Sequence, residues 1–289
     1  MNQQTTFVFG GGGARGALQV GALQALLEAG FRPDLVVGSS AGAINAAFLA
    51  IHGFSRSGLL ALAAAWLGAA EADLLPANYV GMTLRAILRR GTISPVERIR
   101  EFLVANGVQP DLRFGDIRQP KLAIVSSDLG TGTPVIHGQS PEDCVLDALL
   151  LSTALPPWSM PVRRHGRYLM DGAVVSSLPI EPALQCGATD IVALDLIDPR
   201  EPFGPVNGFG TFLNQVTYAV QTRMVKLEME LAAARGVPVF YMLLSSRELV
   251  HIWDFAHTAE LILQGHASAK SAIADYDRME APPGRARDA

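Results

Sequence analysis

The chain has 289 residues, of which 49% are hydrophobic and 17% charged, and its formal net charge at pH 7 is −4. A chain of this length can bury a large core, and the lack of a basic excess argues against a protein that binds nucleic acid by neutralising phosphates. The two cysteines, Cys144 and Cys186, are too few for a disulfide framework. We expect both to be buried free thiols.

The N-terminal residues and the apolar stretches bear on location. The N-terminus has neither the basic start nor the long apolar run of a secretory signal, and the most apolar internal stretch, 59–70, is too short to cross a bilayer. We therefore expect a cytoplasmic protein without a Sec signal or transmembrane helix, which could still contact a membrane peripherally. Residues 59–70 are predicted to form a buried helix, with a lid over an active site as the alternative. Residues 281–289 are predicted to form a disordered tail.

Short apolar runs that favour strands alternate with helical patterns along the chain. Strands are expected at 6–9, 35–37, 121–126, 168–170, 190–195 and 238–243, and helices at 17–29, 41–52, 94–106, 141–151 and 211–235. This alternation predicts an α/β fold of three layers, in which a mostly parallel central sheet has helices on both faces. Ligands bind such sheets at the carboxyl ends of the strands.

A glycine-rich loop, GGGGARG at residues 10–16, lies between the first strand and the first helix. It fits the G-x-G-x-x-G pattern of dinucleotide-binding loops, but Asp34 precedes the second strand instead of ending it, and no Gly-Lys-Ser/Thr of a P-loop follows. We favour an oxyanion hole, in which bare backbone N–H groups and a helix N-terminus hold a transient negative charge. The candidate residues are Gly11, Gly12, Gly13, Ala14, Arg15 and Gly16. The Arg15 side chain would either add charge there or face solvent or a salt-bridge partner.

The second strand runs into GSSAG at residues 38–42, which is a G-x-S-x-G pattern followed by a helix. In this context the pattern is typical of a nucleophile elbow, whose sharp turn requires glycine at Gly38 and Gly42. It predicts Ser40 as a nucleophile. The alternative is a turn of small residues in which Ser39 or Ser40 caps the helix.

A nucleophilic serine needs a base, and the residues alone leave its identity open. The six histidines are His52, His137, His165, His251, His257 and His266. His137 and His165 lie in turn-like segments, and the last three fall in a C-terminal helical pattern. His251 and His257 are spaced too far apart to share a helix face, so we predict no metal site.

Asp171 is the alternative base. It ends an apolar run, is followed at once by Gly172 and Ala173, and would face the same rim of the sheet as Ser40. Partial burial would raise its basicity. An ordinary Asp-Gly turn explains this segment equally well.

Three segments together resemble a known family. GGGARG at 11–16, GSSAG at 38–42 and DGA at 171–173 resemble, in this order, the three signatures of the patatin-like phospholipase family, in particular its bacterial serine lipid acyl hydrolases. SSDLGTG at 126–132 and LSTALPP at 151–157 resemble further family stretches, whereas Ser177 stands where the family usually has asparagine.

The resemblance covers roughly residues 5–275 and implies one catalytic domain with the patatin-like three-layer fold. It implies Ser40 as nucleophile and Asp171 as general base, with the glycine loop as oxyanion hole and without a catalytic histidine, metal or cofactor. The expected substrates are acyl esters of phospholipids or other lipids.

Two other functions stay open. One is hydrolysis of small esters or thioesters at the same site, and the other is a nucleotide-binding or regulatory role without hydrolysis. A set of apolar residues fits either the core, which we favour, or an acyl channel: Trp66, Leu67, Tyr79, Met82 and Leu84.

Overall fold

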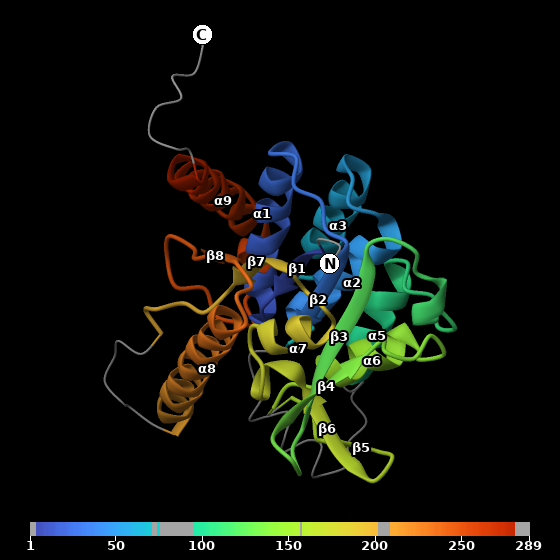
Figure 1. Cartoon of the computed structure of the whole chain (residues 1–289). Coiled ribbons are helices and arrows are strands. Elements are labelled where there is room, and N and C mark those ends of the chain that lie inside the picture. The colour runs from blue at the N-terminus through green and yellow to red at the C-terminus, as the bar shows by residue number, and fades with distance from the viewer. Residues whose placement is uncertain (1–3, 71–73, 76–94, 157, 202–208, 281–289) are drawn as a thin grey trace.

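The computed structural model describes residues 4–70, 74–75, 95–156, 158–201 and 209–280 (Figure 1). The strands are β1 (Thr5–Phe9), β2 (Leu35–Ser39), β3 (Lys121–Asp128), β4 (Thr133–His137), β5 (Val162–Arg164), β6 (Arg167–Asp171), β7 (Asp190–Asp195) and β8 (Val239–Leu243). The α-helices are α1 (Gly16–Glu28), α2 (Ala41–His52), α3 (Arg56–Gly68), α5 (Pro95–Ala105), α6 (Val145–Ser152), α7 (Ile180–Gln185), α8 (Phe209–Ala234) and α9 (Thr258–Glu280). Short 3-10 helices are η1 (Gly13–Arg15), η2 (Phe114–Asp116), η3 (Gly172–Val174) and η4 (Phe255–His257).

The strands form a single sheet with a parallel centre. Strands β3, β2, β1, β7 and β8 lie side by side in this order and are parallel. Strands β4 and β6 both pair antiparallel with β3, and β5 forms a hairpin with β6. The predicted mostly parallel sheet is therefore confirmed at its centre, with an antiparallel extension at the β3 side.

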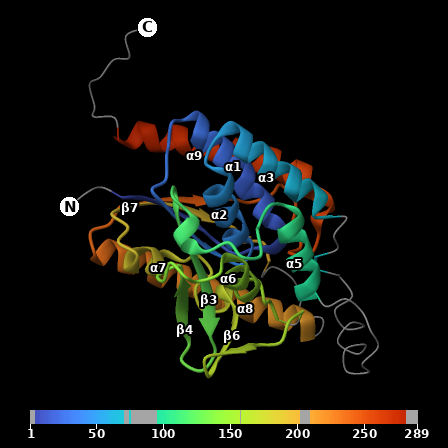
Figure 2. The same ribbon diagram turned by 90° about the vertical axis from the view of Figure 1, so that its right-hand side faces the viewer.

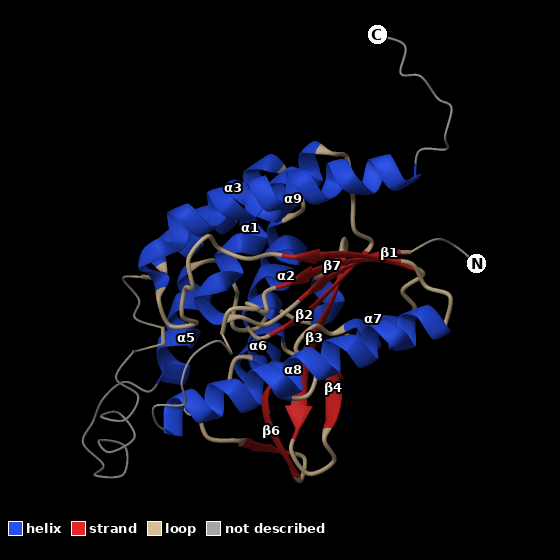
Figure 3. Ribbon diagram, turned by 90° about the vertical axis from the view of Figure 1, so that its left-hand side faces the viewer, coloured by secondary structure: helices blue, strands red, loops and turns tan. Residues whose placement is uncertain are grey.

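Helices cover both faces of this sheet, as Figures 2 and 3 show: α1, α3 and α9 lie on one face, and α7 and α8 on the other. The central strands β1, β2, β3 and β7 are buried on both faces because each face meets a helix layer. In β1, Phe7 and Phe9 pack into the core on the α1 side, whereas Val8 packs into the core on the α8 side. The predicted three-layer α/β/α fold is confirmed.

The N-terminal elements lie close to their predicted positions. Strand β1 begins one residue before the predicted range, α1 is shifted by one residue, and α2 has the predicted bounds. Strand β2 runs two residues further than predicted, to Ser39. These elements have unbroken apolar patterns with glycine-rich turns between them, and for this reason their bounds could be predicted from the sequence.

The segment between β3 and α7 departs most from expectation. The turn predicted around His137 is wrong, because residues 133–137 form β4 along β3 and the His137 ring lies 2.8 Å from Ser126 Oγ. Strand β5 and helix α7 were not predicted. Both are short, and β5 is exposed on its whole length, so it has no apolar pattern to reveal it.

The helix predicted at 141–151 begins only at Val145. The four preceding residues are drawn into another contact, since the carbonyls of Pro141 and Asp143 accept the N–H groups of Gly115 and Phe114. Tertiary hydrogen bonds thus replace the first helical turn.

Two burial predictions need correction. Helix α3 is buried on one face only, because Leu62 and Trp66 lie in the core whereas Leu60 is 60% exposed. Cys144 and Cys186 are free thiols, but both are half-buried instead of buried.

The tail predicted at 281–289 lies outside the described residues. Within the described part, no helix combines the length and the apolar character needed to cross a bilayer.

Helices α1 and α9 cross at two glycines. A Cβ on Gly21 would lie 1.9 Å from the Ile262 carbonyl oxygen, and one on Gly265 would lie 1.9 Å from the Leu18 carbonyl oxygen. Only glycine therefore allows the two backbones to approach this closely.

We expect Gly21→Ala and Gly265→Ala each to destabilise the protein by about 1–3 kcal/mol, because the added methyl forces the helices apart. The measurement is denaturant unfolding of each purified variant. Gly68→Ala is the matched control, since a Cβ there meets nothing within 4 Å and alanine favours helix. Equal stability of all three variants would contradict the close crossing.

Candidate active site

Ser40 lies at a sharp turn between β2 and α2. Its backbone has φ 55° and ψ −126°, a strained combination for a residue with a side chain. The turn is closed by two glycines: a Cβ on Gly38 would lie 2.3 Å from the Gly42 carbonyl oxygen, and one on Gly42 would lie 2.3 Å from the Phe9 carbonyl oxygen. This is the geometry of a nucleophile elbow, in which the serine side chain is turned away from the sheet.

Asp171 reaches Ser40 because two strands share one edge of β3. Strand β2 pairs with β3 up to Val125, and β6 pairs with β3 from Ser126 onward. Both lie on the edge opposite β4, since β4 pairs with residues 124–128 throughout. The carboxyl ends of β2 and β6 therefore meet head-on, and Ser40 Oγ donates a hydrogen bond to Asp171 Oδ2 at 2.7 Å.

The Asp171 carboxyl group is completely buried. Its Oδ1 accepts the N–H of Ala173 at 2.8 Å. Burial raises the pKa of Asp171 to about 7, and the hydrogen bonds from Ser40 and Ala173 oppose this rise. The group is therefore far more basic than an exposed aspartate. A Cβ on Gly172 would lie 2.2 Å from the Val125 carbonyl oxygen, which explains the glycine after Asp171.

Two further serines hold this arrangement. Ser152, in α6, accepts the N–H of Ser40 at 3.0 Å and donates to the Val125 carbonyl oxygen at 2.6 Å. Ser127 donates to the Asp171 carbonyl oxygen at 2.6 Å. Both serines lie in the family-like stretches SSDLGTG and LSTALPP, but neither position carries a local sequence signal for this role.

The glycine loop lies beside Ser40, and most of its amides are engaged elsewhere. Gly11 N–H donates to the Ser177 carbonyl oxygen and Ala14 N–H to that of Ile252. The amides of Arg15 and Gly16 donate within the loop itself. Among the described residues, no acceptor faces the amides of Gly12, Gly13 or Ala41, the last at the N-terminus of α2. Gly13 and Ala41 line the same pocket as Ser40.

Arg15 forms a salt bridge, which was one of its two predicted roles. Its side chain is buried, and Nη1 lies 3.0 Å from Glu201 Oε1. The guanidinium charge is thus paired with an acid that follows β7.

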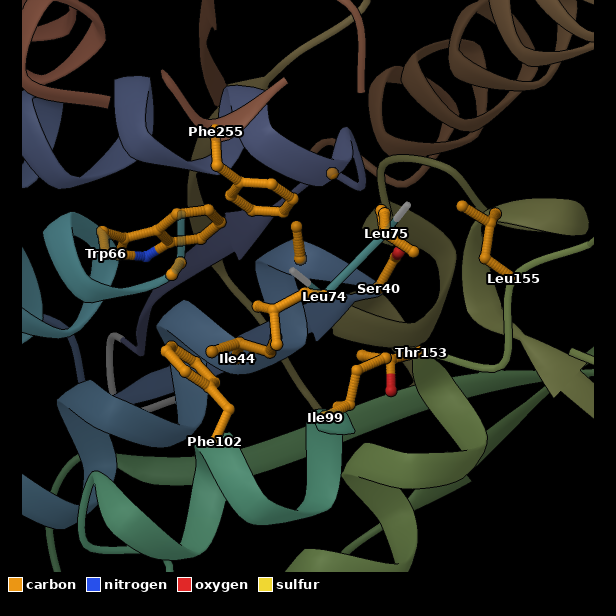
Figure 4. A pocket seen from close by; sticks show the side chains of 13 residues that line it. Ser40, Ile44, Trp66, Leu74, Leu75, Ile99, Phe102, Thr153, Leu155 and Phe255 are labelled. Carbon is orange, nitrogen blue, oxygen red and sulfur yellow. The ribbon is translucent and has the colours of Figure 1, made fainter. Parts of the chain in front are cut away.

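An apolar pocket opens at Ser40 (Figure 4). It has a volume of about 490 Å³, counting its open mouth. In the view of Figure 4, Ser40 and Leu155 lie at one side, Trp66 and Phe102 at the other, and Ile44 between them. Its lining residues are Gly13, Ser40, Ala41, Ile44, Trp66, Ala69, Leu74, Leu75, Ile99, Phe102, Thr153, Leu155 and Phe255.

The residues predicted to lie in the core or an acyl channel have different positions in the structure. Trp66 is buried and also lines the pocket. Leu67 is 51% exposed, so neither interpretation holds for it. Tyr79, Met82 and Leu84 lie outside the described residues. The pocket residues of α5, Ile99 and Phe102, were missed because an amphipathic pattern shows a buried face but not what that face borders.

The histidines lie elsewhere. All six are in the described part of the chain, and there none hydrogen-bonds to Ser40 or Asp171 or lines the pocket. His251 stacks on Trp253, outside the helix predicted for it, and His257 pairs with Asp254.

Comparisons with known proteins show which family the chain belongs to. A model of the family described as patatin-like phospholipase matches residues 7–184. An uncharacterized NTE family protein of Mycobacterium tuberculosis is 30% identical over 205 residues, which cover 70% of this chain and 31% of that protein. Patatin-like phospholipase domain-containing protein 6 of Homo sapiens is 28% identical over 190 residues, covering 65% of this chain and 13% of that protein. The chain thus spans less than a third of either relative's length.

Among solved structures, human GIVD cytosolic phospholipase A2 in complex with methyl gamma-linolenyl fluorophosphonate aligns with a TM-score of 0.49 at 12% identity, covering 96% of this chain and 58% of that one. The family model extends from β1 into α7 and includes the glycine loop, the elbow and the Asp-Gly-Ala turn. The chain belongs to the patatin-like phospholipase family.

Proposed function

We propose that the protein is a serine hydrolase that cleaves acyl ester bonds of phospholipids or other lipids with a dyad of Ser40 and Asp171. Membership in the patatin-like phospholipase family supports lipid hydrolase activity. The observation that carries the proposal is the 2.7 Å hydrogen bond from Ser40 Oγ to the buried Asp171 carboxylate at the mouth of an apolar pocket.

In the first half-reaction, Asp171 accepts the proton of Ser40 Oγ as this oxygen attacks the ester carbonyl. The tetrahedral intermediate collapses, the alcohol or lysolipid leaves with the proton from Asp171, and the acyl group stays on Ser40. In the second half-reaction, Asp171 takes a proton from water, which attacks the acyl-enzyme. Asp171 then returns this proton to Ser40 Oγ as the fatty acid leaves. The buried carboxylate with a pKa of about 7 is suited to this work near neutral pH.

The oxyanion of each tetrahedral intermediate needs N–H donors. Of the six loop residues predicted from the sequence, we assign the amides of Gly12 and Gly13, together with Ala41, because their N–H groups face no acceptor in the described part. Each well-placed donor contributes about 2.7–4 kcal/mol to the stabilisation of such an intermediate. Gly11, Ala14, Arg15 and Gly16 shape the loop instead, since their amides are already bonded.

The pocket favours lipids over small esters. Apart from Ser40 and Thr153, its lining side chains are apolar, so an acyl chain would gain free energy by leaving water. The small-ester or thioester alternative predicts instead that rates do not rise with chain length. A nucleotide-binding role without hydrolysis predicts that a fluorophosphonate leaves Ser40 unlabelled.

We expect Ser40→Ala and Asp171→Asn each to lower kcat/KM for phospholipid or fatty-acyl ester hydrolysis on the order of 10⁴-fold, because each removes one member of the dyad. The loss of kcat/KM is measured by hydrolysis of phospholipids in vesicles and of fatty-acyl nitrophenyl esters. Ser39→Ala is the matched control, since the neighbouring Ser39 hydroxyl is buried without a partner among the described residues. Full activity in folded Asp171→Asn would refute the dyad.

The pH dependence follows from the raised pKa of Asp171, about 7. Below that pH the carboxyl is protonated and cannot accept the Ser40 proton, so kcat/KM should rise as pH increases through about 7 and then level off. A pH profile between 5 and 9 tests this with a neutral acyl ester. A profile that is already flat above pH 5 would show that a group of ordinary acidity, and not this carboxylate, limits the reaction.

Phe102 should limit the acyl chain length. It lines the pocket and also a second hollow between α3 and α5, whose wall includes Ala65 and Glu101. Phe102→Ala should join the two spaces and shift the preference toward longer chains, measured as the ratio of kcat/KM for long and short acyl esters. Val104→Ala, on the exposed face of the same helix, should leave the ratio unchanged. An unchanged ratio in Phe102→Ala would place the end of the chain elsewhere.

A further inference from the structure

Three buried side chains connect the pocket to the glycine loop. Trp66 Nε1 donates to Asn45 Oδ1 at 2.7 Å, and Asn45 Nδ2 donates to Gln19 Oε1 at 2.8 Å. Gln19 and Asn45 are completely buried, although neither belongs to the Ser40–Asp171 pair. Buried amides of this kind are costly unless all their hydrogen bonds are made.

All the donors in this chain of contacts are used. Indole N–H is a donor only, so the Asn45 atom that faces Trp66 must be its oxygen. The Asn45 amide nitrogen therefore donates to Gln19 Oε1 and, at 3.0 Å, to the Gly16 carbonyl oxygen. The Gln19 amide nitrogen in turn donates to the carbonyl oxygens of Gly10, at 2.9 Å, and Leu194, at 3.0 Å. Trp66 thus determines the orientation of both amides.

The carbonyls held in this way flank the glycine loop. Gly10 follows β1 directly, and Gly16 is the first residue of α1. Leu194, in β7, also accepts the N–H of Gly10 at 3.0 Å, so the start of the loop is tied to a central strand. Trp66 packs on the other end, since a Cβ on Gly16 would lie 2.5 Å from the indole ring.

We propose that Asn45 and Gln19 are positioning residues that hold the two ends of the glycine loop, and that Trp66 links this support to the acyl pocket. The proposal rests on the proposed function, because its consequence is the placement of the Gly12 and Gly13 amides. Oxyanion donors act well only when they are held in place before the reaction, and a displacement of about 1 Å can cost 100-fold in rate. The network holds the loop in place, and neither the Asn45 nor the Gln19 amide contacts the substrate.

The main test uses Asn45→Asp, which keeps the size of the side chain. A carboxylate can still accept from Trp66, but it has no donor for Gly16 or Gln19, so both loop ends lose support. We expect kcat for acyl ester hydrolysis to fall about 10- to 100-fold while KM stays within about twofold. Trp66→Phe is a second variant, which removes the indole donor and part of the ring that packs on Gly16 but leaves an aromatic side chain in the pocket.

A control separates positioning from general destabilisation. Ser176→Ala removes a buried hydrogen bond to Glu228 Oε1, 2.7 Å long, in the α8 layer on the other face of the sheet. It should lower Tm and leave kcat unchanged within about twofold. If Ser176→Ala loses as much kcat as Asn45→Asp at equal loss of Tm, the positioning role is overturned.

Amide hydrogen exchange of residues 10–16 gives a readout that needs no activity. The Gly10, Gly11 and Ala14 amides are hydrogen-bonded, so they report on opening of the loop. We expect faster exchange there in Asn45→Asp, and in Trp66→Phe, than in wild type or Ser176→Ala. Unchanged exchange in both network variants would overturn the proposal. If the wild-type protein hydrolyses no acyl ester, the proposed function is refuted, whereas the exchange measurement still tests the network. If Asn45→Asp does not fold, hydrogen exchange and kcat of Trp66→Phe decide whether the proposal stands.

Discussion

The meeting of β2 and β6 on one edge of β3 is the constraint on which the site depends. Strand β2 leaves this edge after Val125, and β6 approaches from the opposite direction to pair with Ser126. Their ends place a serine and an aspartate within hydrogen-bond distance although 131 positions separate them in the chain. Strand β4 makes this possible, because it occupies the other edge of β3 and leaves only one edge for both strands.

The same meeting point explains the chemistry of Asp171. The carboxyl group is completely buried between packed strands and helices, and this burial raises its pKa to about 7. A carboxylate of this basicity is suited to the base role that we propose for Asp171. The cost of burying it is limited by the hydrogen bonds from Ser40 and from the Ala173 amide. The position of Asp171 and its raised basicity therefore both follow from the meeting of β2 and β6.

Close backbone approach accounts for the glycines that the motifs require. Gly38, Gly42 and Gly172 each face a carbonyl oxygen that a Cβ would strike. These contacts bring the elbow, β1 and the Asp-Gly-Ala turn into one compact unit at the carboxyl ends of the strands, where α/β folds bind ligands. The pocket then extends from Ser40 along α2, whose first two residues belong to GSSAG, to α3 and α5, which lie outside the motifs.

The sequence by itself determined the α/β class, the positions of the central strands and the family, because apolar periodicity and glycine spacing are local properties. It also marked Ser40 as the candidate nucleophile and Asp171 as one candidate base, and the preference for the aspartate over a histidine came from the family resemblance and not from spacing. Strand β5 pairs locally with β6, and it lacked a signal because it is exposed. Only the tertiary structure decided the contacts between residues that lie far apart in the chain. The short α7, the late start of α6, the place of Phe102 in the pocket and the contacts of Ser152, Gln19 and Asn45 depend on partners distant in sequence. No local pattern records such partners, since burial and hydrogen bonding are settled only when the strands and helices pack together.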